Sequence, residues 1–343
     1  MSESPSAERA WLRPGFLRRS ITLLARAGVL GGLALLVFAW RLPLDPTTGP
    51  AHPRWELMAA LIDTLRFQLG VALGVATLWL TLVRSWRFAV LALLLCAWAV
   101  LPALTWPASE RQAVSGAASV RVMSINLGMN MADEDLVLEA LRQIDPDVLV
   151  IQEYTPTWAR RLVARFTEQL PHRVERPRED AFGIAAFSSQ PWLRVDELEL
   201  DGSPAPQLRL ELALGETPVV LYAIHLLPPV AARYTAHRRQ CADLLKRLAS
   251  EGPHTLAAGD FNLVDHASIG RALHQLGYLD AHGLAGRSRG ATWPERGWLR
   301  FLPGVRIDHV YLGNGLTSTA AWVAERTGSD HLPIACDVTL ARK

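Results

Sequence analysis

Three long apolar runs dominate the first third of the chain. They cover residues 21–40, 67–83 and 88–106, and each is about as long as a helix that crosses the hydrocarbon core of a membrane. Arg26 interrupts the first run near its start, where a long side chain can reach the membrane interface. One such run could be a buried core helix or a signal peptide, but two more follow it. The pattern therefore predicts a membrane region over residues 1–106 with three transmembrane helices.

The placement of arginines predicts how these helices are oriented. Four arginines precede the first run, and Arg84 and Arg87 stand in the short segment between the second and the third. Because positively charged short segments remain in the cytoplasm, we expect the N-terminus there and everything after Trp106 outside. The sequence thus predicts a multi-pass protein of the cell (inner) membrane with a periplasmic or extracellular domain.

After Trp106 the pattern becomes that of a folded α/β domain. Residues 107–118 are small and polar and are predicted to link the membrane region to a domain over 119–343. Short apolar runs predict strands at 119–126, 147–153, 182–189, 219–225, 254–260, 305–313 and 332–340, with a hairpin over 193–214. Helical periodicity predicts helices at 133–144, 156–170, 233–250 and 266–277. Since strands and helices do not alternate strictly, mostly antiparallel sheets covered by helices are favoured over one parallel sheet.

Charge and cysteine content narrow the classes of partner. Residues 1–106 hold ten arginines and five acidic residues, whereas the remainder holds 28 acidic and 25 basic residues. A domain that binds duplex DNA usually presents a strongly basic face, so this balance lowers the expectation of a nucleic-acid partner. Cys241 and Cys336 fall on apolar faces of predicted elements, which favours two buried thiols over a disulfide.

Polar side chains stand where the predicted strands end. Each interrupts an apolar run with a group that is costly to bury alone. The residues are Asn126, Glu153, His225, Asp260, Asn262, Asp308, Asp330 and His331. A turn or a single local partner could explain any one of them. Strand ends that converge at one edge of a sheet would instead gather all of them into one pocket, which is the interpretation we favour.

The motifs around these residues resemble those of the endonuclease/exonuclease/phosphatase superfamily. The motifs are "QE" ending at Glu153, "GDFN" at 259–262, "RID" ending at Asp308 and "SDH" at 329–331, in the order typical of the family. The resemblance covers residues 119–343. It implies a four-layer α/β/β/α sandwich of mixed, mostly antiparallel sheets, here preceded by a three-helix transmembrane segment, and hydrolysis of phosphoesters with Mg²⁺ or Mn²⁺.

The resemblance also implies a metal site. Glu153 would be the main carboxylate ligand, with Asn126 supplying an amide oxygen and Asp330 a second carboxylate. Mg²⁺ is a hard cation that prefers oxygen ligands, and water and a substrate phosphate commonly complete its octahedron.

The remaining residues would carry the catalytic roles. By the resemblance, Asp260 would orient and deprotonate the attacking water, and Asn262 would donate to the developing charge. His331 would contact the phosphate, with Asp308 fixing its tautomer and charge. His225 is typical of deoxyribonuclease-like and lipid-directed members, which puts a role in abasic-site repair in doubt.

The predicted function is a membrane-anchored, divalent-metal-dependent phosphoester hydrolase. Its substrate is expected to be a lipid-linked or polyprenyl (pyro)phosphate or a phospholipid outside the cytoplasm. An extracytoplasmic nuclease that acts on DNA or RNA is the alternative, and a non-catalytic receptor on the same fold is disfavoured by the intact set of polar residues. The expected partners are the lipid bilayer and a phosphate-ester substrate, with no obligate protein partner.

The loop just before Asp308 is unusually apolar. It contains Trp298, Leu299, Phe301 and Leu302, and it could either touch lipid or fold inward.

Overall fold

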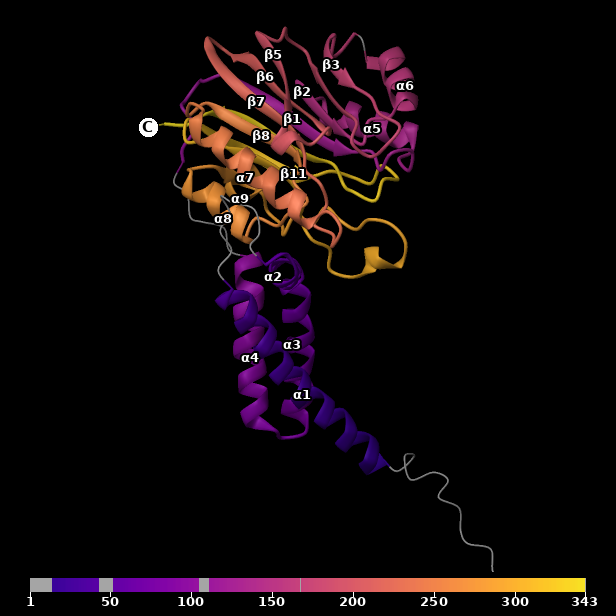
Figure 1. The fold of residues 1–343 in the computed structure, drawn as a ribbon, viewed down its shortest axis with the longest axis vertical. Coiled ribbons are helices and arrows are strands. Elements are labelled where there is room, and N and C mark those ends of the chain that lie inside the picture. The colour runs from indigo at the N-terminus through magenta and orange to yellow at the C-terminus, as the bar shows by residue number, and fades with distance from the viewer. Residues whose placement is uncertain (1–13, 43–51, 105–110, 167, 343) are drawn as a thin grey trace, which may run out of the picture. The chain divides into compact units, whose positions relative to one another are not determined.

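The computed structural model describes residues 14–42, 52–104, 111–166 and 168–342, which form two compact units (Figure 1). Among these residues, the first unit holds 14–42 and 61–104, and the second holds 52–60 and 111–342. The first unit is helical, and the second is an α/β sandwich.

The first unit contains three packed helices. They are α1 (Pro14–Arg41), α3 (Arg66–Leu82) and α4 (Trp86–Val100), followed by a 3-10 turn at Leu101–Ala103, while α2 (Pro53–Thr64) is divided between the units. Small residues allow close packing, since a Cβ on Gly70 would lie 2.5 Å from Cγ2 of Val100. Arg26 donates to the Ser85 hydroxyl at 3.0 and 3.1 Å, so this charge is satisfied within the unit.

One helix of this unit is long and apolar enough to cross a membrane. It is Phe16–Arg41. Helices α2 and α3 reach the required length only together and are bent by 61° at their junction. Helix α4 has 15 residues, which at 1.5 Å per residue gives about 22 Å, less than the roughly 30 Å hydrocarbon core.

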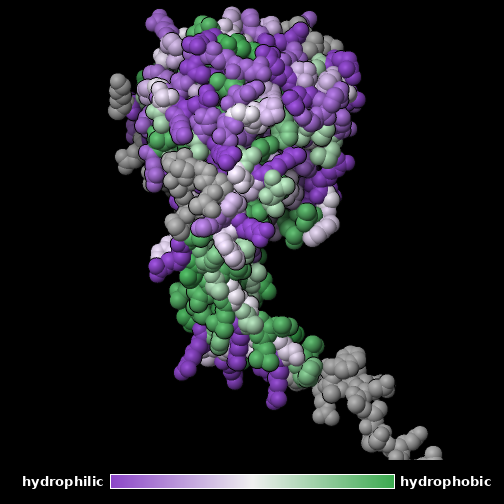
Figure 2. Space-filling model, in the orientation of Figure 1, coloured by the Kyte–Doolittle hydropathy of each residue, from purple (hydrophilic) through white to green (hydrophobic). Residues whose placement is uncertain are grey.

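The three predicted transmembrane helices are therefore not shown. By length and composition the described residues give one candidate span, or two if the bent pair counts as one. The end of the predicted third run, at 105–106, lies outside the described residues. A single apolar helix near the N-terminus is also what a signal sequence or a single anchor presents, so the multi-pass topology remains a prediction. Figure 2 shows a nearly continuous apolar surface on the helices of this unit.

The second unit is built on two six-stranded sheets. The strands of the first are β1 (Ser119–Asn126), β2 (Val148–Gln152), β3 (His172–Arg176), β4 (Ile184–Ser188), β11 (Leu316–Val323) and β12 (Ile334–Leu340). Those of the second are β5 (Arg194–Glu199), β6 (Pro206–Leu214), β7 (Thr217–His225), β8 (Thr255–Asp260), β9 (Leu279–Asp280) and β10 (Asp308–Leu312). Their orders are β11-β12-β1-β2-β4-β3 and β5-β6-β7-β8-β10-β9. Among the described strands, only β1/β2 and β7/β8 pair in parallel, so the sheets are mixed and mostly antiparallel.

Helices cover the outer faces of both sheets. They are α5 (Glu134–Ile144), α6 (Pro156–Phe166), α7 (Tyr234–Ser250) and α8 (Ser268–Gln275). The short α9 (Ala281–Ala285) is not one of them, because its Ala281 and Leu284 pack in the core between the sheets. Alternate residues of a strand face opposite sides, so Val122 packs between the sheets while Met123 packs with Leu141 and Trp158 under α5 and α6. On the other side, α7 covers the second sheet (Figure 1), and its Leu244 packs in a third core there. The predicted four-layer α/β/β/α order is thus observed.

The sequence did not predict the strands β3, β9 and β11. Strand β3 reads "HRVER" and carries one apolar residue on the edge of its sheet, and β9 has only two residues.

Part of the predicted linker lies against the sandwich. Val114 donates its backbone N–H to the carbonyl of Leu340 at 3.0 Å, and the Arg111 guanidinium donates to the carbonyl of Leu312 at 2.9 Å. Residues 107–110 of that linker lie outside the described residues.

Candidate active site

The two parallel strand pairs bring polar residues to one edge of each sheet. The carboxyl ends of parallel strands meet at the same edge. In the first sheet Asn126 ends β1 beside Gln152, and Glu153 follows directly with a positive φ of 54°. In the second sheet His225 ends β7 beside Asp260, which ends β8. The predicted convergence of strand ends therefore takes place in both sheets.

The antiparallel neighbours complete the set. Strand β10 begins with Asp308, which lies directly opposite Asp260. Strand β12 runs antiparallel to β1 and pairs Ile334 with Ser124, so the segment just before β12 lies at the same edge as Asn126. His331 belongs to that segment.

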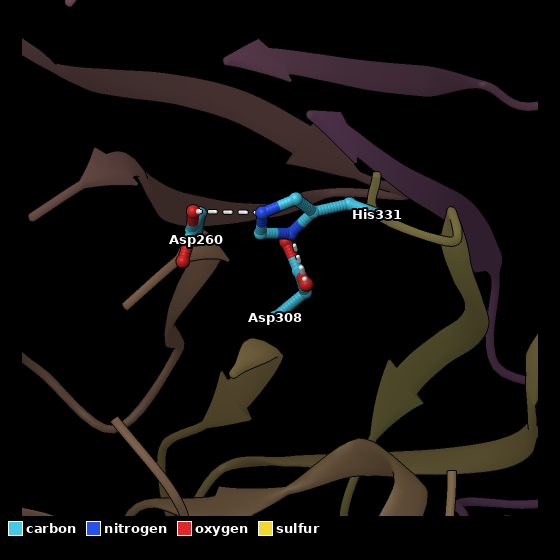
Figure 3. Close-up of side chains that lie close together, drawn as sticks. All are labelled: Asp260, Asp308 and His331. Atoms are coloured by element: carbon cyan, nitrogen blue, oxygen red, sulfur yellow. Dashed lines mark hydrogen bonds and ion pairs between the residues drawn. The ribbon is translucent and has the colours of Figure 1, made fainter. Parts of the chain in front are cut away.

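A continuous series of contacts joins the two halves of the site. The amide nitrogen Nδ2 of Asn126 lies 3.4 Å from Oε1 of Glu153 and 3.1 Å from Oδ2 of Asp260. The same Asp260 oxygen lies 3.9 Å from Nε2 of His331, whose Nδ1 lies 2.9 Å from Oδ2 of Asp308. Figure 3 shows the His331 ring between the two aspartates. Residues from both sheets thus form one polar cluster.

Burial and mutual charge set the protonation of this cluster. Burial alone would lower the pKa of His331, but Asp308 and Asp260 outweigh it and raise that pKa to about 10. Burial, reinforced by Asp308, raises the pKa of Asp260 to about 7. Burial lowers the pKa of His225 to about 4. At neutral pH His331 is therefore an imidazolium and His225 is neutral.

The other predicted catalytic residues surround Asp260. Nε2 of His225 lies 3.7 Å from Oδ2 of Asp260, and the Phe182 ring lies against the His225 ring with centroids 5.7 Å apart. Asn262 has a positive φ of 51° and donates its backbone N–H to Oδ1 of Asp260 at 2.8 Å. Its amide nitrogen donates to the carbonyl of Leu226 at 2.9 Å, which leaves a second N–H on the same nitrogen for a substrate.

Two groups of residues in this cluster could hold a metal ion. By distance, the ligand atoms of Asp260, Asp308 and His331 lie within 4.8 Å of one another. A cation there would have to displace the proton on His331, because an imidazolium offers no lone pair. The group predicted from the sequence is different and consists of Glu153, Asp330 and Asn126.

The donor set around Glu153 fits a divalent cation. Burial raises the pKa of Glu153, and the nearby charge of Asp330 raises it further. Among the residues that the structure describes, no arginine or lysine forms an ion pair with either carboxylate, and the charge of His331 offsets only part of the effect of burial on Glu153. A divalent cation would compensate the remaining charge. Asn126 presents its nitrogen to the carboxylates, while its oxygen accepts from the backbone N–H of Gly128 at 2.9 Å. Its amide would have to turn over to serve as a ligand.

Three residues that hold the site were not found by sequence reasoning. Thr292 accepts the backbone N–H of Asp308 at 3.4 Å, and Ser329 joins the carbonyl of Asn126 at 2.7 Å to the backbone N–H of His331 at 3.1 Å. Gln207 pairs with the backbone of His225 in both directions, at 2.6 and 3.0 Å. In the sequence, each of the three is a polar residue that stands at a buried strand position or beside a motif. Such residues are too common to indicate a functional role by themselves.

Three residues outside the cluster are buried side chains of the domain core. His309 follows Asp308 directly but is fully buried away from the site and pairs with Asp280. Cys241 and Cys336 are both buried and free, so the domain has two thiols rather than a disulfide.

The fold and the cluster define a class of protein. Two packed mixed sheets with helices outside, and aspartates, a histidine and an asparagine at the strand ends, are typical of phosphoesterases built as an α/β sandwich. The model of the Endonuclease/Exonuclease/phosphatase family matches residues 123–331, which is more than half of the chain and contains all eight candidate residues. The chain therefore belongs to this family, and it is a phosphoesterase of that kind.

Solved structures show the same fold. D. rerio TDP2 complexed with a single-strand DNA product has a TM-score of 0.54 at 16% identity, over 64% of this chain and 99% of that one. Truncated Caenorhabditis elegans TDP2 gives 0.51 at 19% identity, over 64% and 98%. An endonuclease/exonuclease/phosphatase from Bacteroides vulgatus gives 0.53 at 15% identity, over 65% and 99%. No curated protein matches the sequence. At these identities the likeness concerns the fold alone.

Proposed function

We propose that this protein is a divalent-metal-dependent phosphoester hydrolase, anchored in the membrane, that acts on a lipid-linked phosphate outside the cytoplasm. The observation that carries the hydrolase proposal is the cluster in which Asp260 contacts Asn126, Asn262 and His331 while Asp308 holds His331. Such a set can activate a water and stabilise a phosphoryl group in one place.

Asp260 is suited to act on the attacking water. It is buried and its pKa is raised toward neutrality, so it can take a proton near physiological pH. The Asn262 backbone and the Asn126 amide hold its two oxygens, so the carboxylate has one fixed orientation. The water would lose its proton to Asp260 as its oxygen bonds to phosphorus, while the bond between phosphorus and the leaving-group oxygen breaks.

His331 and Asn262 are suited to act on the phosphate. As an imidazolium held by Asp308, His331 carries a positive charge into a buried site and can donate to a non-bridging or leaving oxygen. The free N–H of the Asn262 amide supplies a second donor. Glu153 and Asp330, with Asn126 if its amide turns over, would hold Mg²⁺ or Mn²⁺, which when bound polarises the phosphoryl oxygen and neutralises charge.

A lipid-linked substrate is favoured by the composition of the chain. Helix Phe16–Arg41 supports membrane attachment, and the part of the chain after residue 106 is slightly acidic. Both features suit a substrate in a membrane better than duplex DNA, whose binding relies on basic surface. A nuclease is the second candidate, because a structure with the same fold holds a single-strand DNA product.

The experiment uses the full chain purified in detergent. We expect phosphate release from a polyprenyl pyrophosphate in the presence of Mg²⁺ and no cleavage of plasmid DNA under the same conditions. The Glu153→Ala variant serves as the control for contaminating hydrolases. Cleavage of the plasmid without release of phosphate from the lipid would replace the lipid proposal with the nuclease. Absence of both activities, in a folded and metal-loaded protein, would contradict the hydrolase proposal.

A further inference from the structure

An exposed apolar loop projects from the sandwich next to the site. Residues 296–303 are all exposed, and they include the short 3-10 helix Trp298–Phe301. Trp298 is 70% exposed and Phe301 76%, with Leu302 at 50%. Figure 1 shows this segment standing away from the body of the domain, and Figure 2 shows an apolar patch at the same place on a largely hydrophilic surface. The inward-folded arrangement is therefore not the one observed.

The base of this loop is held firmly. Trp293 and Val305 exchange backbone hydrogen bonds in both directions, at 3.0 and 2.6 Å. Val305 also packs in a small core with Val264 and Ile307. The apolar tip is thus presented by a closed loop, and its exposure does not depend on a free chain end.

The same base touches the candidate active site. Nε1 of Trp293 donates to Oδ2 of Asp330 at 3.4 Å, and the backbone N–H of Glu295 donates to the carbonyl of Asp330 at 2.8 Å. Asp330 directly precedes His331. Whatever the loop tip touches is therefore brought next to the residues proposed to bind phosphate.

The composition of the loop matches an anionic lipid surface. Within 296–303 the charged residues are Arg296 and Arg300, both exposed, and there is no acidic residue. The guanidinium carbon of Arg300 lies 4.8 Å from the centroid of the Phe301 ring. An aromatic and aliphatic tip flanked by arginines suits the boundary between headgroups and acyl chains. A protein partner would not require basic residues in this loop, whereas anionic lipid headgroups attract them.

We propose that residues 296–303 insert their apolar side chains into the interfacial layer of an anionic lipid bilayer. The chain that carries the loop also carries the apolar helix Phe16–Arg41, so tethering would keep the local lipid concentration high and a shallow contact would suffice. The lipid contact itself requires no catalysis, whereas its use in presenting a lipid-linked phosphate to the site rests on the proposed function.

The test places a fluorescent probe on the loop of the full chain. Phe301→Cys is labelled with an environment-sensitive fluorophore in a Cys96→Ala background, since Cys241 and Cys336 are buried. Leu193→Cys is the matched control, because Leu193 is 58% exposed and lies on the same domain just before β5. Both proteins are reconstituted in nanodiscs that contain phosphatidylglycerol, with and without brominated acyl chains.

We expect the probe at position 301 to shift to the blue and to be quenched about twofold or more by brominated lipid, and the probe at 193 to do neither. A probe at 301 that reports water overturns the proposal. So does a blue shift without bromolipid quenching, which would mean that protein, such as a second copy of the chain, covers the loop.

A second readout concerns catalysis. In the Trp298→Ser/Phe301→Ser variant we expect the rate on a vesicle-borne phosphoester, relative to a water-soluble one, to fall about tenfold. The Leu193→Ser/Val195→Ser variant should keep the ratio of the native protein. If native protein hydrolyses neither substrate, the proposed function fails while the quenching result still decides the lipid contact. If the ratio stays unchanged in the loop variant, the role in presenting substrate is overturned.

Discussion

Asp260 and Asp308 lie directly opposite each other across the antiparallel pair β8/β10, and both are buried. Two carboxylates in such a position repel each other and lose hydration. His331 offsets this cost, because its two ring nitrogens face the two aspartates at 3.9 and 2.9 Å. The three side chains therefore act as a unit in which each charge depends on the other two.

The first prediction follows from this arrangement. Replacing Asp308 by Asn keeps the shape of the side chain but removes the charge that holds His331 as an imidazolium. We expect kcat on a phosphoester to fall about 10²–10⁴-fold, the range for loss of acid–base catalysis. His331→Gln should lose as much, and the double variant little more, because the two residues serve one function. Steady-state kinetics with matched thermal melting curves measures this.

The control for these variants is Glu139→Gln, on the exposed outer helix α5, where the carboxylate pairs only with neighbours on the same helix. It should keep full activity. Additive losses in the Asp308→Asn/His331→Gln double variant would contradict the view that the pair works as one unit.

The second prediction concerns pH. In the proposed mechanism the active form has Asp260 deprotonated and His331 protonated. Burial and Asp308 raise the pKa of Asp260 to about 7, and the two aspartates raise that of His331 to about 10. The rate should therefore rise as pH increases through the first value and fall as pH increases through the second. A bound cation nearby would move the acidic limb to lower pH.

The Asp308→Asn variant tests the assignment of the alkaline limb. Asp308 is the strongest of the groups that raise the pKa of His331, so without its charge the alkaline limb should move to lower pH. A profile of kcat/KM against pH for the two proteins gives the comparison. An alkaline limb at the same pH in both would assign that limb to another group.

The third prediction concerns metal. EDTA should abolish activity, and Mg²⁺ or Mn²⁺ should restore it, because no arginine or lysine among the described residues pairs with Glu153 or Asp330 and their oxygens are ligands that these cations prefer. Glu153→Gln removes one ligand charge and should weaken Mg²⁺ binding about tenfold or more by isothermal titration calorimetry. If Asp308→Asn weakens the binding and Glu153→Gln does not, the ion is held instead by Asp260, Asp308 and His331.

The sequence was sufficient to predict which polar residues meet, because most of them stand at strand ends. Apolar runs predicted where β1, β2, β7 and β8 stop, and parallel pairing then brings Asn126 and Glu153, or His225 and Asp260, to one edge. The pattern could not predict the orientation of the Asn126 amide, which depends on the N–H of Gly128. Nor could it predict Ser329 and Thr292, whose roles arise only when separate segments meet.

The membrane region shows where a pattern of hydrophobicity stops being informative. Hydropathy identified apolar runs at 21–40, 67–83 and 88–106, but it does not indicate where each helix begins and ends. The structure forms the second run as the 17-residue helix α3, bent by 61° from α2 just before it, and ends α4 at Val100. Among the described residues, one helix by itself is then long enough to cross a membrane.

The fourth prediction addresses that topology. A reporter that fluoresces only in the cytoplasm should stay dark when it is joined after Trp106, and alkaline phosphatase joined at the same point should be active, because the three predicted crossings would place this point outside. Fusions joined after Arg41 and after Arg84 map the intermediate segments. Fluorescence at Trp106 would mean an even number of crossings or the opposite orientation.

The last prediction concerns the charged cluster beneath β10. Arg306 and His309 both pair with Asp280, and all three side chains are almost fully buried. Burial alone would raise the pKa of Asp280, but its interactions with Arg306 and with the His309 ring hold it below the usual range. Arg306→Leu should leave this carboxylate without its main partner and lower the free energy of unfolding by about 3–5 kcal/mol.

Arg326→Leu is the matched control. It breaks an ion pair with Glu295 in which the Arg326 side chain is 57% exposed, and it should lower the free energy of unfolding by at most about 1 kcal/mol. Denaturant unfolding of the two variants gives the comparison, and equal losses would mean that the buried cluster contributes no more than a surface pair.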